Sequence, residues 1–304
     1  CEIIIGLTDG GFYQLPKVGA RPCAAPFMQF ADFTKRKFYE LSLRALSEAE
    51  RSRGVIAASS GNHGAAVAYA AHTLGCTASV CVPTYASETK IAAIRSYGAE
   101  VTQVGDDCVL TEVHARALAE REGRAYISPY NDLDVVRGQG TLGAELSEQI
   151  PDLDAVFIAV GGGGLIGGVG AYLKGFNPEI QVVACSPERS PALHACLEAG
   201  HHVDVPCEST VSDATAGGVE TGALTVPLCV EVIDRSLLVD EAAIEEGMRY
   251  LIGVHHTLVE GAAGVVVAGW RQVAHEFAGR RVALVICGAN ISLDALGQVL
   301  AGAR

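Results

Sequence analysis

The sequence lacks an excess of basic residues and any long apolar run. Its 22 Lys and Arg residues are outnumbered by 35 Asp and Glu residues, which leaves a formal net charge of -13. Because nucleic-acid phosphates are bound by clustered Lys and Arg side chains, we expect no nucleic-acid partner. No segment is apolar over the length that a membrane-spanning helix needs, and no signal peptide is evident, so we expect no membrane partner.

A metal or disulfide pattern is also absent, although the chain contains ten cysteines. No C-x-x-C spacing occurs, and Cys76, Cys81, Cys185 and Cys229 lie in apolar segments. We therefore expect buried free thiols in a reducing compartment, the cytoplasm. The chain opens at Cys1 rather than at Met, which we interpret as a start inside a longer chain or after trimming.

What the sequence does contain, from about residue 54 onward, is an alternation of β-rich segments with segments of helical periodicity. The predicted strands are 54–58, 78–82, 100–103, 155–160, 181–185 and 282–286, and the predicted helices include 61–74, 87–97 and 111–121. This alternation predicts an α/β fold with largely parallel sheets covered by helices on both faces. No repeat or low-complexity linker divides the chain, so we expect any second domain to be inserted rather than appended.

Three predicted strands end in unusual loops, and ligands of open α/β sheets bind beyond the carboxyl ends of the strands. Ser59-Ser60-Gly61-Asn62-His63-Gly64 follows the first of these strands. Small residues there begin a helix whose first N–H groups would point at an anion such as a substrate carboxylate. Asn62 could donate a hydrogen bond to a ring oxygen. An ordinary strand-to-helix turn explains the same residues equally well.

The second loop is a run of four glycines, Gly161 to Gly164, followed by Leu165 at the start of a helix. Consecutive glycines allow the backbone to surround a tetrahedral anion with several N–H groups, and the helix dipole favours the same anion. We predict a phosphate site. The Lys-Ser/Thr of a nucleotide P-loop is missing, which counts against ATP or GTP. A dinucleotide site and a merely flexible loop remain as alternatives.

The third loop, Cys287-Gly288-Ala289-Asn290, follows the strand predicted at 282–286. The Cys287 thiol is a weak hydrogen-bond donor and acceptor that could meet a ring nitrogen. For this loop alone, a packed thiol is the better interpretation.

A set of motifs from about Leu43 to the C-terminus agrees with one assignment. The set comprises Ser59–Gly64, Val82-Pro83 with Lys90, Gly98–Val101, Ser128–Tyr130, Gly138–Thr141, Gly161–Gly164, Asp213–Val219, Val259–Gly264 and Cys287–Asn290. Together they resemble the fold-type-II pyridoxal 5′-phosphate (PLP) enzymes, in the branch of serine and threonine dehydratases and serine racemases. This resemblance implies two open, twisted, mostly parallel sheets flanked by helices, as in the tryptophan synthase β-subunit. It also implies a large PLP-binding domain of residues 1–36 and 135–304 and a small inserted domain of residues 37–134.

The resemblance further implies a role for each matched residue. The cofactor phosphate would be held by the backbone of Gly161, Gly162, Gly163, Gly164 and Leu165. Asn62 would bond the ring hydroxyl, Cys287 would face the pyridine nitrogen, and Glu260 would lie near the ring. The substrate carboxylate would be held by Ser59, Ser60, Gly61, Asn62 and His63.

The lysine that links to the cofactor is assigned by spacing. The family carries it in Ser-Phe-Lys-x-Arg-Gly-Ala, some 25 residues before the second serine of the later loop, and counting back from Ser60 gives Lys35. The local sequence Asp32-Phe33-Thr34-Lys35-Arg36-Lys37-Phe38 otherwise departs from that motif, as do residues 1 to about 42 in general, although Gln29 matches a family glutamine. Lys37 is the second candidate, and the alternative is that both lysines lie on the surface.

The activity that the resemblance implies is dehydration and deamination of a small L-3-hydroxy amino acid such as threonine or serine. Lys35 would remove the Cα proton, and PLP would stabilise the carbanion. A neutral thiol at Cys287 holds a proton on the ring nitrogen less firmly than a carboxylate would, which suits β-elimination over transamination. Ser60 permits an alternative, an amino-acid racemase that uses Lys35 and Ser60 as its two bases. A third interpretation is a PLP-fold protein impaired by its atypical N-terminus.

The remaining expectations concern metals, assembly and regulation. The racemase branch carries a cation site, of which Glu188 matches the first acidic residue, but His194 stands where Asp is usual, and we predict no metal site. We expect a homodimer with an amino acid as its small-molecule partner. The isoleucine-inhibited members of the family carry a C-terminal regulatory domain and none follows Arg304, so we expect a catabolic role.

Overall fold

The computed structural model describes residues 2–7, 11–15, 35–59, 61–86, 88–106 and 108–302. Side chains are described within these ranges from Tyr39 onward, except at positions 89, 108 and 109. The chain divides into two compact units, a smaller one of Thr34–Gly138 and a larger one of Cys1–Phe33 with Gln139–Arg304. In chain order the smaller unit is therefore an insertion into the larger one, and the second boundary falls inside helix α6 (Leu133–Gln149). The predicted boundaries were at 36/37 and 134/135.

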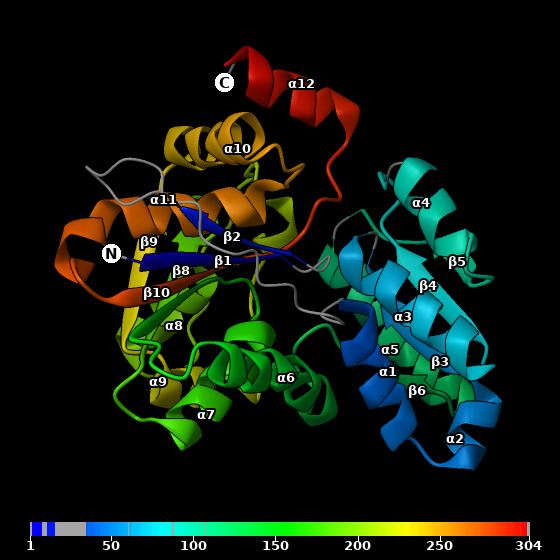
Figure 1. The fold of residues 1–304 in the computed structure, drawn as a ribbon. Coiled ribbons are helices and arrows are strands. Elements are labelled where there is room, and N and C mark those ends of the chain that lie inside the picture. The colour runs from blue at the N-terminus through cyan, green and yellow to red at the C-terminus, as the bar shows by residue number, and fades with distance from the viewer. Residues whose placement is uncertain are drawn as a thin grey trace. The chain divides into compact units, whose positions relative to one another are not determined.

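The smaller unit contains a four-stranded sheet in which all strands run parallel, in the order β5-β4-β3-β6 (Figure 1). The strands are β3 (Val55–Ala58), β4 (Ala78–Val82), β5 (Glu100–Gln103) and β6 (Ala125–Tyr126). The helices are α1 (Lys35–Ala45), α2 (Glu48–Arg53), α3 (Asn62–Leu74), α4 (Glu88–Arg95) and α5 (Cys108–Glu122), followed by the start of α6.

The two central strands of this sheet are buried along their whole length because helices cover both of their faces. Ile56 and Cys81 pack against Ala115 and Ala119 of α5 on one face. Successive side chains of a strand point to opposite faces, so Val80 faces the other side, where α3 packs against β4. Both layers are consequently required to complete the core.

The larger unit contains a six-stranded sheet in the order β2-β1-β10-β7-β8-β9. The strands are β1 (Glu2–Leu7), β2 (Gly11–Leu15), β7 (Ala155–Ala159), β8 (Gln181–Pro187), β9 (Arg235–Val239) and β10 (Arg281–Ile286). All neighbouring strands pair in parallel except β1 and β2, which are antiparallel. The helices that follow α6 are α7 (Gly164–Phe176), α8 (Ala192–Ala199), α9 (Thr225–Val232), α10 (Glu241–His255), α11 (Gly261–Val273) and α12 (Leu293–Ala301), with short 3₁₀ helices η1 (Asp213–Thr215) and η2 (Ala274–Phe277).

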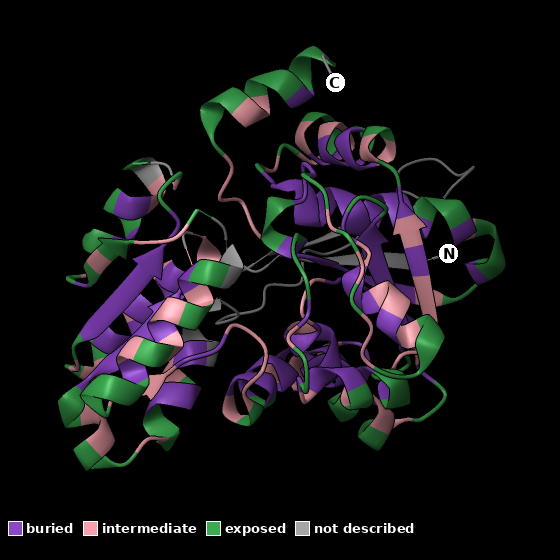
Figure 2. Cartoon of the chain, turned by 180° about the vertical axis from the view of Figure 1, so that it is seen from behind, coloured by how far each residue is buried: buried purple, intermediate pink, exposed green. Residues whose placement is uncertain are grey.

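The larger sheet is also covered on both faces. In Figure 1, α10 and α11 lie on one side of it and α7, α8 and α9 on the other. The inner strands β7, β8 and β10 are accordingly apolar and almost wholly buried, whereas β9 at one edge alternates between buried and intermediate residues (Figure 2). Within the described ranges, no helix is long and apolar enough to cross a bilayer.

The predicted fold class is confirmed by these two mostly parallel, helix-covered sheets. Each strand predicted between residues 54 and 286 is present to within two residues, and the predicted helices correspond to α3, α4 and α5. Four of the described strands were not predicted: β6 and β9, and also β1 and β2, which extend the larger sheet beyond β10.

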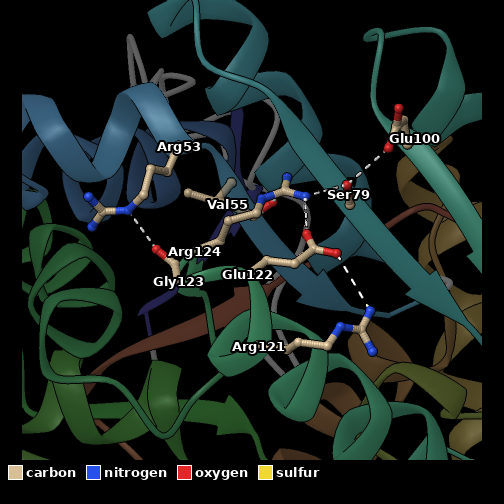
Figure 3. Close-up of polar contacts among 8 residues, drawn as sticks. All are labelled: Arg53, Val55, Ser79, Glu100, Arg121, Glu122, Gly123 and Arg124. Carbon is tan, nitrogen blue, oxygen red and sulfur yellow. Dashed lines mark hydrogen bonds and ion pairs between the residues drawn. The ribbon is translucent and has the colours of Figure 1, made fainter.

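The amino ends of the strands in the smaller unit are joined by Arg124, immediately before β6. Its guanidinium donates to the Val55 carbonyl oxygen at 2.8 Å and to Ser79 Oγ at 3.0 Å, and it pairs with Glu122 at 3.2 Å (Figure 3). Ser79 in turn donates to Glu100 at 3.3 Å. Arg124 therefore links β6 directly to the amino-terminal ends of β3 and β4, and through Ser79 to that of β5. The predicted ligand loop after β3 lies at the opposite, carboxyl ends of the strands.

Candidate functional site

In the larger unit, the carboxyl end of β7 leads through the four-glycine loop into α7. Gly163 precedes the first helical residue and has a φ of +86°, in the left-handed region that favours glycine. Its carbonyl oxygen accepts the first helical bond, from the N–H of Gly167 at 2.8 Å. The glycines thus turn the backbone sharply from the strand into the helix and leave the first N–H groups of α7 at the carboxyl end of the sheet.

No side chain of the described residues caps the start of α7. Other helices of the chain are capped: Ser47, Asp240 and Ser292 accept from the first turns of α2, α10 and α12. A helix start without such an acceptor has unsatisfied N–H donors and a positive dipole end, which suit an external anion. No described side chain caps the starts of α8, α9 and α11 either, so it is the uncapped start together with the glycine loop that points to a ligand at α7.

The loop has no room for a side chain at Gly161 or at Gly163. A Cβ on Gly161 would lie 3.1 Å from Cα of Thr215, and a Cβ on Gly163 would lie 2.9 Å from Sγ of Cys229. The Cys229 thiol also donates to the Gly163 carbonyl oxygen at 3.5 Å, which turns that oxygen toward α9. Backbone N–H groups are therefore what the loop offers to a ligand, and they fit the phosphate of PLP.

Residues 210–215, which include η1, pack against the glycine loop. Glu241, the first residue of α10, accepts from Thr210 Oγ1 at 2.6 Å and from the Val211 N–H at 2.8 Å. Ser212, fully buried, hydrogen-bonds Thr215 at 2.7 Å. Thr215 touches Gly161, as noted above, while Val211 and Ser212 lie against Gly261 at the start of α11. One segment thus fixes both the glycine loop and the residue that follows Glu260.

Glu260 fixes the Cys287 loop. Its carboxylate is 1% exposed and accepts from the Asn290 N–H at 2.8 Å, while its own N–H donates to the Gly288 carbonyl oxygen at 3.1 Å. Gly288 has a φ of +94°, and a Cβ there would overlap the Glu260 carboxylate. Cys287, buried at the end of β10, is therefore held between a central strand and a loop clasped by Glu260.

In the smaller unit, the carboxyl end of β3 leads through Ser59 into α3. Ser59 Oγ accepts from the Gly61 N–H at 3.0 Å, and no described side chain caps the helix itself. A Cβ on Gly64 would overlap the Ser59 carbonyl oxygen and lie 3.1 Å from both Val80 and Ile94. Gly64 therefore allows the first turn of α3 to lie directly on the end of β3.

His63, in that first turn, is buried. Its Nε2 lies 2.9 Å from the Ile127 carbonyl oxygen, and its ring lies 4.8 Å from the ring of Tyr39, centroid to centroid. Burial lowers the pKa of His63 to about 4, so the imidazole is neutral at physiological pH. Its side chain is thus engaged by protein groups, and the predicted contact of His63 with the substrate is left to its backbone N–H.

The structure places the remaining predicted residues as follows. Asn62 is the first residue of α3 and is half-buried, and Lys35 is the first residue of α1, although its side chain is outside the description. Ser60 lies outside the described residues. The structure brings Glu260 to the Cys287 loop and joins His63 to Ile127 and Tyr39. The roles assigned to these residues stay predictions.

Several supporting residues escaped the sequence analysis. Cys229 and Thr215 contact the glycine loop, and Glu241 holds the segment behind it. Cys229 was assigned only as a packed thiol, and nothing in its apolar surroundings distinguishes it. Thr215 lies in the Asp213–Val219 motif, which was the one available signal.

Among the described residues, no further ligands for a cation lie near Glu188. Glu188 is exposed, and the His194 imidazole is hydrogen-bonded to Ser236 Oγ at 2.8 Å. In the described part of the chain, no three His, Cys, Asp or Glu residues cluster as metal ligands would. All seven described cysteines are free thiols, five of them buried.

A doubly covered α/β fold with a glycine loop and uncapped helix starts at strand ends is typical of proteins that bind an anionic ligand. A family model described as "Pyridoxal-phosphate dependent enzyme" matches residues 33–288. The chain therefore belongs to the pyridoxal-phosphate-dependent enzyme family, which confirms the predicted family and cofactor.

Individual relatives are similar over most of this chain. The L-threonine ammonia-lyase of Thermotoga maritima is 37% identical over 84% of this chain and 63% of its own length. The catabolic L-threonine dehydratase TdcB of Escherichia coli is 31% identical over 90% of this chain and 85% of its own length. The chain spans about half the length of other relatives, such as the biosynthetic L-threonine dehydratase of E. coli, of which it covers 50%.

Solved structures agree with this placement. The processed form of threonine deaminase isoform 2 from Solanum lycopersicum superposes with a TM-score of 0.83, at 32% identity over 88% of this chain and 79% of that one. Maize serine racemase superposes with a TM-score of 0.80, at 29% identity over 88% of this chain and 82% of that one.

Proposed function

We propose that this chain is a PLP-dependent ammonia-lyase that converts threonine or serine to a 2-oxo acid and ammonia. The observation that carries the proposal is the glycine loop, in which neighbours leave no room for a side chain at Gly161 or Gly163 and the helix start is uncapped. The names of the similar proteins, threonine ammonia-lyase, dehydratase and deaminase, supply the substrate class.

The larger unit supplies the groups that bind the cofactor in this proposal. The backbone N–H groups of Gly161–Leu165 hold the phosphate, and Cys287 faces the pyridine nitrogen. The Glu260 carboxylate accepts a hydrogen bond from the Asn290 N–H and so holds the loop that carries Cys287. In this proposal Glu260 influences the cofactor ring through that loop. Bound PLP supplies an electron sink for negative charge at the substrate Cα.

The smaller unit supplies the groups that act on the substrate. Lys35 takes the proton from Cα, and the β C–O bond then breaks. The hydroxyl leaves as water with a proton from a general acid, a role that the phosphate of the bound cofactor would fill. Water converts the resulting enamine to the 2-oxo acid and ammonia. The Ser59–His63 loop holds the substrate carboxylate through the first N–H groups of α3, and Asn62 bonds the ring hydroxyl.

The test is 2-oxo acid release from a panel of 3-hydroxy amino acids by the PLP-loaded chain and its Lys35→Ala variant. We expect 2-oxobutanoate from threonine or pyruvate from serine, and a loss of at least about 100-fold in kcat for Lys35→Ala, since a general base contributes that much or more. Full activity in Lys35→Ala, or no product from any member of the panel, would reject the proposal.

A second candidate, racemisation, is favoured by the serine at position 60 and by the likeness to maize serine racemase. Two bases on opposite faces of Cα would be Lys35 and Ser60. Measuring the chirality of unconsumed serine separates the two activities. Retained L-serine supports the lyase alone, whereas D-serine that disappears in Ser60→Ala supports the racemase.

The assembly and compartment that we propose are a homodimer in the cytoplasm. The free thiols of the described cysteines suit a reducing compartment. Light scattering coupled to size exclusion tests the assembly: twice the chain mass supports the dimer, and a single chain mass contradicts it.

A further inference from the structure

His63 stands in the motif that contacts the substrate, yet its side chain makes contacts inside the smaller unit only among described residues. Its residue exposure is 8%, and its Nε2 lies 2.9 Å from the carbonyl oxygen of Ile127, 64 residues further along the chain. Ile127 directly follows β6 and precedes Ser128, whose hydroxyl accepts from the Asn131 N–H at 3.0 Å. His63 thus ties the first turn of α3 to the ordered turn between β6 and α6.

The same imidazole touches α1, the helix that begins at Lys35. Tyr39, one helical turn after Lys35, is 4% exposed, and its ring packs at 59° to the His63 ring with 4.8 Å between centroids. Helices α1 and α3 also pack extensively on each other. His63 therefore lies where three segments meet: the helix that starts at Lys35, the turn that carries Asn62, and the turn after β6.

The hydrogen bond defines the chemical form of the ring. A carbonyl oxygen only accepts, so Nε2 carries the proton and Nδ1 is unprotonated. Nδ1 is buried and has no hydrogen-bond partner among the described residues. The pKa of about 4 that burial imposes agrees with this neutral tautomer. A neutral ring with its only N–H already donated has nothing to offer a substrate carboxylate.

We infer that His63 is a positioning residue, which sets the placement of the Lys35 helix against the Asn62 turn through Tyr39 and Ile127. This inference rests on the proposed function, because it assigns His63 a role in presenting Lys35 to the cofactor. A direct contact of the His63 imidazole to the substrate carboxylate would instead make its side chain a substrate-binding group. The two roles predict different changes in the loaded enzyme.

Three variants separate these roles. His63→Gln retains an amide N–H near the position of Nε2, whereas His63→Met fills a similar volume without a donor. Thr111→Val is the matched control, because Thr111 is also buried in the smaller unit and its hydroxyl also donates to a backbone carbonyl, that of Val104 at 2.8 Å. It lies in α5 and contributes to no predicted site.

The measurements are the rate at which added PLP forms an adduct that borohydride fixes covalently to the chain, the absorbance spectrum of the bound cofactor, and kcat and KM separately. We expect His63→Met to slow covalent loading and lower kcat by about tenfold, the effect of about 1.4 kcal/mol, with KM little changed. His63→Gln should restore most of both. Thr111→Val should lower thermal stability without changing loading, spectrum or kcat.

Two results would overturn the inference. One is a rise in KM with unchanged loading and spectrum in His63→Met, which would show a substrate contact. The other is equal loss of loading in His63→Met and Thr111→Val, which would show a general stability effect. Failure of the proposed function would be distinguishable from failure of this inference. In that case the unmodified chain itself would retain no PLP after borohydride reduction and would release no 2-oxo acid.

Discussion

The loop after β7 and the loop after β3 are both strand-to-helix turns that offer helix N–H groups, but they are built differently. The β7 loop is made of glycines, and its neighbours Thr215 and Cys229 occupy the space that side chains would need. The β3 loop carries Asn62 and His63, and buried contacts hold it: Ile127 and Tyr39 around His63, and the strand end under Gly64.

This difference indicates two ways to recognise an anion. A backbone cradle depends on conformations that only glycine adopts easily, so it is sensitive to any added side chain. A turn that presents side chains depends on the residues that hold it, so it is sensitive to the loss of its supports.

Adding a side chain to the glycine loop should have the largest effect. Gly163→Ala forces alanine into a φ of +86° and toward Cys229 Sγ. A left-handed alanine costs about 1–2 kcal/mol, which corresponds to a roughly 5- to 30-fold weaker PLP affinity if it is expressed in binding. Fluorescence titration of the apo chain with PLP measures it.

The matched control for that variant is Gly175→Ala in the same helix. Gly175 is exposed, and a Cβ there would meet nothing within 4 Å. This variant should keep PLP affinity and gain up to about 1 kcal/mol of stability from helix propensity. Equal affinities for Gly163→Ala and Gly175→Ala would contradict the cradle.

Removing the Glu260 carboxylate, which holds the Cys287 loop, should have the second-largest effect on PLP binding. Glu260→Ala leaves the Asn290 N–H without its acceptor and frees the Cys287 loop. We expect a loss of about 1–3 kcal/mol in the free energy of unfolding, a shifted absorbance of bound PLP, and faster labelling of Cys287 by a thiol reagent. Glu246→Ala, which removes an exposed ion pair with Arg271, should change neither spectrum nor labelling.

The pH dependence of stability should report on the support of the β3 loop. The pKa of His63 is about 4 in the folded chain and 6.5 in an exposed reference, so the unfolded state binds the proton more readily. Stability contributed by the neutral ring is present above pH 6.5 and declines as the pH falls toward 4. Tyr39 and Ile127 face the ring, and Asp132 lies near Tyr39.

The measurement is the melting temperature of the chain and of His63→Gln between pH 7 and pH 5. The difference between the two melting temperatures should change with pH, because glutamine at position 63 cannot take up the proton that His63 takes up on unfolding. A constant difference across this range would contradict a neutral, buried His63.

The smallest effect on PLP binding is expected for a change at Arg124, at the amino ends of the strands of the smaller sheet. Arg124→Lys cannot reproduce the bonds to Val55, Ser79 and Glu122 together (Figure 3). We expect a loss of about 1–3 kcal/mol in unfolding free energy, for two lost hydrogen bonds, with PLP affinity and kcat unchanged. Denaturant titration measures the unfolding free energy, and a parallel PLP titration measures the affinity. A loss of PLP affinity in Arg124→Lys would show that the amino ends of the strands and the ligand loops at their carboxyl ends are not independent.

Local patterns predicted much of the fold and the ligand loops. Apolar segments of strand length and alanine-rich helical segments marked β3, β4, β7, β8, β10 and α3 to α5, and four successive glycines marked the cradle. The supports could not be predicted, because they join distant residues: 64 positions separate His63 from Ile127, and 66 separate Gly163 from Cys229. Such pairs follow from the packing of elements and leave no periodic signal.

Near the N-terminus, the cofactor lysine was predicted from spacing and not from a local motif. Lys35 was assigned by its distance from Ser60, and the structure adds that it begins α1, the helix that packs on α3. Spacing favours Lys35 over Lys37, and the structure places both lysines in the first turn of α1.

The central claim is that Lys35 carries the cofactor, and borohydride reduction of the PLP-loaded chain followed by peptide mapping tests it most directly. The sequence contains five lysines, Lys17, Lys35, Lys37, Lys90 and Lys174. Of these, Lys174 donates to Asp234 and to two backbone carbonyls, which makes it a poor competitor. We predict a single pyridoxyl label on Lys35. A label on Lys37 or any other lysine, or no label at all, would contradict the account.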